Sequence, residues 1–448
     1  MCITDRGYVY MCSGKPMRLF LIALVISLFA APVYAEGADT INQADTIWVL
    51  ISSALVMLMT PGLGLFYAGM VRRKNVLATI LQSFIMVGIV GVLWVICGYS
   101  LAFGKDHWGL IGGFDWVFLR NVGLTPNPDY SATIPHQAFM IYQAMFAIIT
   151  PALITGAFAE RMRFKAFVIF SMLWALMVYA PIAHWVWAPG GWLREAGALD
   201  FAGGMVVHVS SGVAALCCAI VLGRRKGFGK DEFTPHNLTM TVIGTALLWF
   251  GWFGFNAGSS LAANGIAVSS FVATNTAGAT AAMVWLLIEW KHRGKPTALG
   301  AMTGAVAGLA AVTPASGFIC PAAAMTIGAL ASLICYFAIM LKGKFRYDDS
   351  LDVFGVHGIG GMWGVLAVGL FATKVINPAG GDGIFAGTHS FSLLFSQLKG
   401  IAAVGGYSLI VTFALLKLIG IFTPLRVDSS DEDAGLDLSQ HGEIGYHF

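Results

Sequence analysis

Two histidines lie in apolar, glycine-rich runs that resemble each other. One run is Gly204-Met-Val-Val-His208-Val-Ser-Ser-Gly212, and the other is Val353-Phe-Gly-Val-His357-Gly-Ile-Gly-Gly361. In both runs a valine precedes the histidine and a glycine follows four residues later. An ionisable ring at membrane depth is costly, which indicates a functional site. A neutral imidazole carries one donor and one acceptor nitrogen, so two rings that share a proton could relay a proton or hold a small polar molecule.

Haem ligation is a second chemistry open to paired transmembrane histidines. It would place the two rings on opposite sides of a wide macrocycle, and no second histidine pair is spaced as a redox chain would require. The seven cysteines contain no CxxC spacing, and most lie in apolar runs, which is typical of small core residues rather than of metal ligands or disulfides. We therefore expect no cofactor, no metal and no enzymatic activity.

A separate group of residues could bind a cation. Phe255-Asn-Ala-Gly-Ser259 ends an apolar run with an aromatic ring, a carboxamide and a hydroxyl. Aromatic faces attract cations by about 0.5–2 kcal/mol, depending on desolvation, and a hydroxyl can accept a hydrogen bond from a cation's N–H. Tyr142 and Phe146 are four residues apart and therefore share one helix face, although helix packing alone would also explain that pair.

The composition is that of a membrane protein. Of the 448 residues, 57% are hydrophobic and 11% are charged, and the mean hydropathy is +0.76. Soluble proteins carry about 25% charged residues. The formal net charge is only +3 and no basic stripe is present, which argues against nucleic-acid binding. The chain is therefore predicted to be an all-α polytopic membrane protein.

Eleven apolar segments are long enough to cross a bilayer. They run approximately over residues 45–70, 77–102, 137–159, 166–187, 203–223, 238–257, 265–289, 297–313, 320–341, 353–373 and 400–421. The loops on one side hold sixteen lysines and arginines, and those on the other side hold five. The positive-inside rule then places the mature amino terminus outside and the carboxyl terminus in the cytoplasm.

The chain is expected to have three parts. Residues 1–35 resemble a signal peptide, with a basic start, an apolar core from Leu19 to Ala31 and the small residue Ala35 for cleavage. A retained transmembrane helix is the alternative, but this core is shorter than the roughly 20 residues that a span needs. Residues 36–425 form the transmembrane domain, and residues 426–448 form an acidic tail whose composition alone predicts disorder.

The transmembrane domain is predicted to contain an inverted repeat. The histidine runs fall in the fifth and tenth segments, and Phe66-Tyr-Ala-Gly69 in the first segment resembles Phe255-Asn-Ala-Gly258 in the sixth. Each repeat therefore holds five helices, at about 45–223 and 238–373, and the eleventh helix at about 400–421 lies outside the repeat. An odd number of helices puts the two repeats in opposite orientations, so the two histidines should meet near the midplane.

Several motifs together resemble the ammonium transporters of the Amt/Mep/Rh family. They are Phe255-Asn-Ala-Gly-Ser259, Asp200-Phe-Ala-Gly-Gly-Met-Val-Val-His208, Ala159-Glu-Arg-Met-Arg163, Asp352-Val-Phe-Gly-Val-His-Gly358 and Gly435-Leu-Asp-Leu-Ser-Gln-His-Gly-Glu443. The resemblance covers about residues 45 to 446, and the Asn-Ala-Gly-Ser ending and the tail are similar to the bacterial Amt branch. It implies a homotrimer of eleven-helix protomers in the bacterial inner membrane, each protomer with its own pore.

The resemblance also implies roles for individual residues. Tyr142, Phe146, Trp187 and Ser259 would form an ammonium-recruiting vestibule, Phe146 and Phe255 would form a gate, and His208 and His357 would line the pore. Many family members carry Phe at the position of Tyr142, so its hydroxyl is a departure. Asp200 resembles a buried acidic residue of the family, and its place before a span favours a helix cap over contact with a cation. The tail would dock on the cytoplasmic face, where a PII-type regulatory protein could bind.

The expected function is nitrogen uptake by membrane transport of ammonium. A bare cation at the centre of a bilayer costs between about 3 and 15 kcal/mol, so an apolar pore blocks potassium, whereas ammonium can give up a proton. NH4+ would be captured at the vestibule and deprotonated, and NH3 would pass the histidine pair. The alternatives are an ammonium sensor and a transporter of another small amine or cation.

Overall fold

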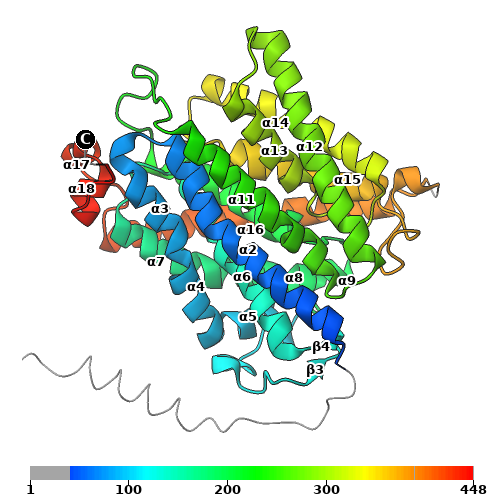
Figure 1. The fold of residues 1–448 in the computed structure, drawn as a ribbon. Helices are drawn as coiled ribbons and strands as arrows, with labels where there is room; N and C mark the ends of the chain where they lie inside the picture. Colours follow the sequence, from blue (N-terminus) through cyan, green and yellow to red (C-terminus); the bar gives the residue numbers. More distant parts are fainter. Residues whose placement is uncertain (1–40, 388, 447–448) are drawn as a thin grey trace, which may run out of the picture. The chain divides into compact units, whose positions relative to one another are not determined.

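The computed structural model describes residues 41–387 and 389–446, so the predicted signal peptide at 1–35 lies outside the described residues. Helices make up most of this part of the chain (Figure 1). Ten of them are long and apolar enough to cross a membrane, which confirms a mostly helical, polytopic membrane fold. They are Gln43–Met70, Arg73–Phe103, His136–Ala157, Phe164–Glu195, Gly204–Leu222, Leu238–Ser260, Gly265–Arg293, Pro321–Phe345, Phe354–Phe371 and Ser392–Phe422.

Many of these spans join α-helical, 3-10 and π-helical segments. The first half contains α2 (Gln43–Met70), η2 (Arg73–Asn75), α3 (Val76–Phe84), α4 (Met86–Leu93), η3 (Trp94–Gly98), α5 (Tyr99–Phe103), β1 (Asp106–His107), β2 (Ile111–Gly112), η4 (Val117–Leu119), β3 (Pro126–Asn127), β4 (Ser131–Pro135), α6 (His136–Ile154), η5 (Thr155–Ala157), α7 (Phe164–Trp174), η6 (Ala175–Tyr179), α8 (Ala180–Trp187), α9 (Trp192–Glu195), η7 (Gly204–Val209) and α10 (Ser210–Leu222). The second half contains α11 (Leu238–Ala257), η8 (Gly258–Ser260), α12 (Gly265–Arg293), α13 (Ala298–Val312), α14 (Pro321–Phe345), η9 (Phe354–Ile359), α15 (Gly360–Phe371), η10 (Ile384–Ala386), α16 (Ser392–Phe422), α17 (Ser429–Ala434) and α18 (Leu436–His441).

The segment predicted to cross the membrane at 297–313 is shorter in the structure than a full span. It forms α13, an apolar helix of 15 residues. At 1.5 Å per residue, such a helix is about 22 Å long, whereas the hydrocarbon core of a bilayer is about 30 Å thick. Pro314 follows the C-cap residue Thr313, and a proline at this place cannot continue a helix. The ends of this helix agree with the predicted segment to within one residue, but the helix is not among the ten that are long enough to span.

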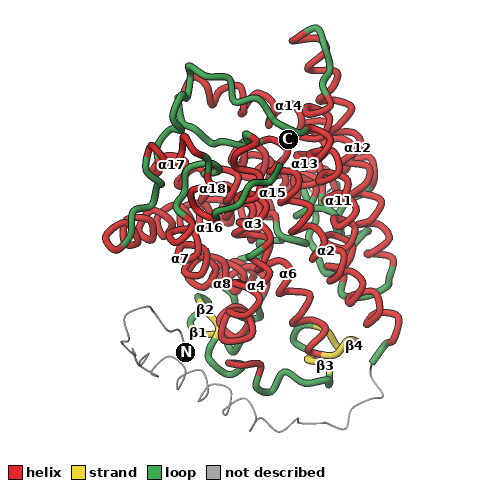
Figure 2. The backbone as a smooth tube through the Cα atoms, turned by 60° about the vertical axis from the view of Figure 1, so that its left-hand side comes forward, coloured by secondary structure: helices red, strands yellow, loops and turns green. Residues whose placement is uncertain are grey.

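Two short β-hairpins mark one end of the helical bundle, which we call the strand end. β1 pairs with β2 and β3 with β4, and both pairs are antiparallel. α2 begins at this end, where the Asn42 N–H donates to the Thr133 carbonyl of β4 at 2.8 Å. The helices α17 and α18 lie at the other end, which we call the tail end (Figures 1 and 2).

The long helices pack in groups that leave the histidine-bearing turns inside. α2 and α11 lie side by side along the middle of Figure 1, and α12 packs against α13 and α14. The turns η7 and η9 contact each other, and both also contact α10, α13 and α15. The fold therefore surrounds these two short segments with longer helices.

Buried ion pairs join four separate loops at the tail end. Glu160 accepts a hydrogen bond from the Arg72 N–H at 2.7 Å, and Arg225 Nη1 lies 3.2 Å from its other oxygen. Arg225 also pairs with Asp348 at 2.8 Å. Burial alone would raise the pKa of the Glu160 carboxyl, but the ion pairs with Arg225 and Arg72 outweigh it and hold that pKa below its ordinary value. The spans that these loops connect are therefore fixed relative to one another at this end.

The acidic tail packs against α3 and a neighbouring loop. The Asp437 carboxylate accepts hydrogen bonds from the N–H groups of Leu77 and Ala78 at 3.1 and 2.8 Å, at the start of α3. Glu432 accepts a hydrogen bond from the Lys226 N–H at 2.6 Å. Composition alone predicted disorder for this segment, whereas the family resemblance predicted docking. The structure has the docked arrangement, because acidic side chains of the tail bind backbone N–H groups that would otherwise face water.

Replacing Glu160 tests the buried ion network. Glu160→Gln should lower the free energy of unfolding by about 3–5 kcal/mol, because buried arginines would face a neutral amide. The folded pKa of Glu160 lies below its ordinary value of 4.5, so the carboxylate's contribution is complete above that pH and is lost as the pH falls through the folded pKa. Denaturant titration in detergent micelles should therefore show a full difference from wild type at pH 7 that closes in acid. Glu195→Gln, at an exposed glutamate of α9, is the control, and equal losses for both variants would contradict the network's role.

Candidate functional site

His208 and His357 lie side by side in the buried interior. Each is part of a π-helical turn, His208 of η7 and His357 of η9. Their Nδ1 atoms are 3.3 Å apart, and their ring planes are inclined by 17°. At this distance the two Nδ1 atoms can hold one proton between them, with one ring as donor and the other as acceptor. The structure thus brings together the two histidines that the sequence analysis predicted to meet.

Two glycines allow the turns to approach so closely. A Cβ atom on Gly212 would lie 2.2 Å from the Gly358 nitrogen, and a Cβ on Gly361 would lie 2.7 Å from the Cβ of His208. Gly212 and Gly361 each follow one of the paired histidines by four residues. α10 and α15, which follow the two turns and carry these glycines, therefore leave room for the opposite turn, and a side chain at either glycine would push the segments apart.

The same contact is incompatible with haem held between the rings. A bis-histidine haem has its axial rings on opposite faces of the iron. The separation of 3.3 Å between the Nδ1 atoms of His208 and His357 leaves no room for an iron and its macrocycle. Sharing a proton is the chemistry that this geometry supports.

Asp200 holds the start of η7. Its two carboxylate oxygens accept hydrogen bonds of 2.6–3.1 Å from the N–H groups of Gly203, Gly204, Met205 and Val206. Burial raises the pKa of the Asp200 carboxyl, although these four amide donors act in the opposite direction. Because backbone donors occupy both oxygens, the arrangement favours a helix-capping role over direct contact with a cation.

A second aspartate lies at the start of η9. Asp349 Oδ2 accepts a hydrogen bond from the Phe354 N–H at 2.8 Å, while its Oδ1 is buried without a partner among the described atoms. Burial raises the pKa of Asp349 to about 6, and the neighbouring Lys342 acts against this rise. Both histidine-bearing turns therefore begin at a buried carboxylate.

A cavity of about 210 Å³ lies at the strand end. It is lined by Phe103, Asp129, Tyr130, Phe139, Tyr142, Gln143, Phe146, Trp187, Arg194, Phe201, Ser259 and Leu261. This set includes all four residues that the family resemblance assigns to a vestibule. The indole N–H of Trp187 donates to the Asp200 carbonyl at 2.9 Å, which fixes the ring at the cavity wall. Aromatic faces and a hydroxyl around one small cavity are groups that attract a cation.

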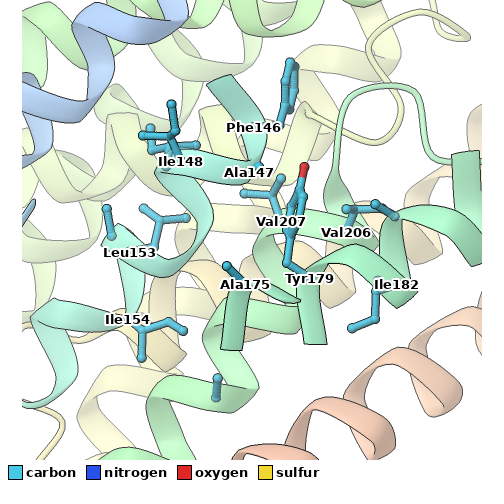
Figure 3. Close-up of a cluster of buried hydrophobic side chains, with 14 of the residues drawn as sticks. Phe146, Ala147, Ile148, Leu153, Ile154, Ala175, Tyr179, Ile182, Val206 and Val207 are labelled. Atoms are coloured by element: carbon cyan, nitrogen blue, oxygen red, sulfur yellow. The ribbon is translucent and has the colours of Figure 1, made fainter. Parts of the chain in front are cut away.

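Phe146 and Phe255 separate this cavity from the histidine pair. Their ring centroids are 4.4 Å apart, and the Phe255 centroid lies 6.1 Å from that of His208. Phe146 lines the cavity, whereas Phe255 lines the space on the histidine side. Figure 3 shows Phe146 in a cluster of buried apolar side chains that also includes Tyr179 and Val207. The two phenylalanines thus form one aromatic barrier.

A void of about 10 Å³ lies beyond the barrier. It is lined by Met59, Leu63, Phe66, Ile149, Leu153, Val207, His208, Leu248, Trp252, Phe255, Val306 and His357. The two histidines contribute imidazole rings and Trp252 an indole, and aliphatic and aromatic side chains form the remaining wall. About 10–15 Å³ of such space is the least that holds one water molecule. The void is therefore at the lower limit of the space that one water-sized molecule needs, and it is too small for a hydrated ion.

The structure adds residues that the sequence reasoning did not single out. Trp252 packs beside His208 with ring centroids 5.7 Å apart and donates its N–H to Thr313 at 2.9 Å. Trp252 precedes Phe255 by three residues, so helical spacing could have placed both on one face. Gln143 lines the strand-end cavity, but nothing in its spacing distinguishes it from a packing residue.

Comparison with known proteins identifies the family. The profile of the Ammonium Transporter Family matches residues 47–446. The chain belongs to the ammonium transporter family. It is 53% identical over 406 residues to an ammonium transporter of Bacillus subtilis, covering 90% of this chain and 99% of the relative. It is also 49% identical over 405 residues to the ammonium transporter Amt1 of Archaeoglobus fulgidus, covering 90% and 100% of the two chains.

Solved structures agree with this assignment. Mep2 of Saccharomyces cerevisiae is similar with a TM-score of 0.82 at 36% identity, covering 87% of this chain and 89% of the other. A protein described as a Sensor Amt Protein is similar with a TM-score of 0.81 at 29% identity, covering 89% and 98%. This member of the ammonium transporter family therefore shares its fold with relatives along most of both chains.

A methyl group at the histidine crossing should disrupt the site. Gly212→Ala places a Cβ 2.2 Å from the Gly358 nitrogen, and overpacking of this kind costs about 1–3 kcal/mol or more. We expect a lower thermal midpoint in detergent and loss of ammonium transport in vesicles. Gly406→Ala is the matched control, because that glycine of α16 has nothing within 4 Å of the added Cβ. A Gly212→Ala protein that matches the control in both measurements would show that the close approach is not needed.

Proposed function

We propose that this protein moves ammonium across the membrane by separating NH4+ into NH3 and a proton. The observation that carries the proposal is the order of three features: the strand-end cavity, the Phe146–Phe255 barrier, and the apolar void with its histidine pair. The cavity offers aromatic faces and a hydroxyl to a cation. The void is lined mainly by aliphatic and aromatic side chains, and the histidine pair contributes imidazole rings to it. A substrate that can change from a cation to a neutral molecule suits both places.

The strand-end cavity would recruit NH4+. Tyr142, Phe146 and Trp187 supply aromatic faces, each worth about 0.5–2 kcal/mol to a cation depending on desolvation. Ser259 supplies a hydroxyl oxygen that can accept an N–H of the substrate. Potassium is also attracted to aromatic faces, so its exclusion depends on the steps that follow.

Loss of a proton would admit the substrate to the void. A bare cation there faces a cost of about 3–15 kcal/mol, which NH3 avoids. When the two Nδ1 atoms share a proton, one Nε2 is an acceptor and the other carries a hydrogen. His208 Nε2 is buried and has no partner among the described atoms, which leaves it available to NH3. NH3 that passes alone makes the protein an ammonia channel, and a proton that follows along the pair makes transport electrogenic.

The proposal includes the orientation and assembly of the chain. The strand end faces outside and the tail end faces the cytoplasm of a bacterial cell, in keeping with the distribution of lysine and arginine. Residues 1–35 are a cleaved signal peptide, and the mature chain forms a homotrimer. The inverted repeat is supported by the π-helical turn that contains the histidine in both halves. The docked tail would present the surface for a PII-type protein.

An ammonium sensor is the second candidate function. The similarity to the protein described as a Sensor Amt Protein favours it. A sensor could use the same cavity to bind NH4+ without net transport. Growth of a transporter-deficient bacterium on limiting ammonium separates the two, because only a transporter restores growth.

Currents in proteoliposomes test the main proposal. An ammonium pulse should produce a current or an internal pH change, whereas an equal pulse of potassium should not. His357→Ala should abolish this ammonium response or admit potassium, because the apolar path loses its shared proton. His292→Ala, at an exposed histidine that contacts Tyr336 at 2.7 Å at the end of α12, should behave like wild type.

Two results would refute the proposal. Equal wild-type responses to potassium and ammonium would show that the pore does not select by deprotonation. A His357→Ala protein that assembles and still transports ammonium selectively would remove the histidine pair from the mechanism. Competition by methylammonium in the same assay shows whether other small amines share the path.

A further inference from the structure

The hydroxyl of Tyr142 is held by the end of α11 and the turn η8, beside the cavity that the residue lines. The residue is completely buried, and its hydroxyl oxygen lies 2.9 Å from the carbonyl oxygens of both Gly254 and Phe255. The same oxygen lies 3.2 Å from Ser259 Oγ. Its three polar neighbours all belong to the end of α11 and the turn η8. The aromatic ring can therefore serve the cavity while the hydroxyl serves another purpose.

This hydroxyl ties α6 to the residues that form the barrier and the cation site. Ser259 Oγ also lies 2.9 Å from the Phe255 carbonyl, to which it can donate. When both hydroxyls donate to backbone carbonyls, the lone pairs of Ser259 Oγ remain free to accept from a substrate. In that arrangement no hydrogen lies between the two hydroxyl oxygens, so the phenol acts on the serine through the turn: it binds the Gly254 and Phe255 carbonyls, and the Phe255 carbonyl also accepts from Ser259.

α2 also holds this turn and the loop that follows it. Trp48 Nε1 donates to the Ala257 carbonyl at 3.2 Å, and Asp45 Oδ1 accepts from the Ala263 N–H at 2.8 Å. Neither Trp48 nor Asp45 lines the strand-end cavity. The position of Ser259 relative to Phe146 and Trp187 is therefore set by tethers from two helices, with Tyr142 as the tether on the cavity side.

We propose that Tyr142 is a positioning residue that sets the size selectivity of the cavity by tying Ser259 and Phe255 to α6. The inference rests on the proposed ammonium site. With the turn held, the serine oxygen and the aromatic faces stand at fixed distances suited to NH4+, and a methyl group on the cation has to displace one of them. Without the phenol oxygen the turn can move, so the site accepts the larger cation at less cost and holds the smaller one less well.

The test measures two substrates in proteoliposomes. Tyr142→Phe keeps the ring and removes only the tether, so we expect the KM for ammonium to rise about three- to tenfold, the effect of losing one hydrogen bond. The maximal current should change little. The KM for methylammonium should rise less, so the ratio of the KM for methylammonium to the KM for ammonium falls. Tyr407→Phe is the matched control, because its hydroxyl also donates to a backbone carbonyl, that of Met177 at 2.8 Å, away from the cavity.

A double-mutant cycle with Ser259→Ala tests whether Tyr142 acts through the serine. In the Ser259→Ala background, Tyr142→Phe should have little further effect on the KM for ammonium. Additive effects would mean that the phenol contacts the cation directly, and a lower KM would mean that it competes for the serine; either result would overturn the proposal. An unchanged ratio of the two KM values in Tyr142→Phe would also overturn the proposal, as would an equal change of that ratio in the Tyr407→Phe control.

Asp45→Ala covers the case in which Tyr142→Phe does not assemble. It releases from α2 the loop that follows the same turn and should lower the ratio in the same direction, and an unchanged ratio would again overturn the tether. The response of the wild-type protein separates a failure of the proposed function from a failure of the role of Tyr142. If it gives no ammonium response, the proposed function fails; if it responds normally while the variants leave selectivity unchanged, only the role of Tyr142 fails.

Discussion

The close crossing of the two histidine-bearing turns is the constraint on which the other features depend. Two imidazoles can share a proton only if their nitrogens lie within hydrogen-bond distance, and here the Nδ1 atoms are 3.3 Å apart. The turns reach this separation because Gly212 and Gly361 carry no side chain at the points of contact. Small residues are the usual means of close helix approach in membranes, where apolar burial gives little driving force between helices. The histidines thus face each other because the glycines beside them have no side chains.

A crossing of this kind requires that both turns begin at defined places. Asp200 provides this for η7 by accepting four backbone N–H groups, and Asp349 accepts one at the start of η9. The buried ion network extends this control. Asp348, the neighbour of Asp349, pairs with Arg225, which also pairs with Glu160 beyond the end of α6. The helix that carries Phe146 and the turn that carries the second histidine are therefore joined through charges at the tail end.

The sequence predicted the features that repeat or that follow from hydropathy, and it missed those that depend on distant partners. The histidine pair could be predicted because two similar runs pointed to each other. The stacking of Trp252 on His208 depends on a neighbouring turn, so the helical spacing from Phe255 gives the face on which Trp252 lies but not the residue that it meets. The docking of the tail depends on Lys226 and on the free N–H groups of α3, which composition cannot show. Asp129 and Tyr130 reach the cavity from the turn of the β3–β4 hairpin; the Asn127-Pro128 pair indicates a turn, but not that the turn lies against the cavity.

Several polar groups in or beside the cavity are already bonded within the protein, whereas the side-chain oxygen of the lining residue Gln143 is buried without a partner among the described atoms. The Trp187 N–H is bonded to a carbonyl, the Asp200 carboxylate to four amides, and the hydroxyl of Ser259 lies between Tyr142 and Phe255. Groups held in this way need no reorganisation when a ligand arrives, and preorganisation strengthens binding by removing that cost. Because these groups are fixed, the site cannot rearrange easily around a larger ligand. On the proposed path, the cavity with its fixed polar groups therefore selects the substrate by size. The void beyond the cavity selects by charge, because apolar walls surround the ring nitrogens of the histidine pair.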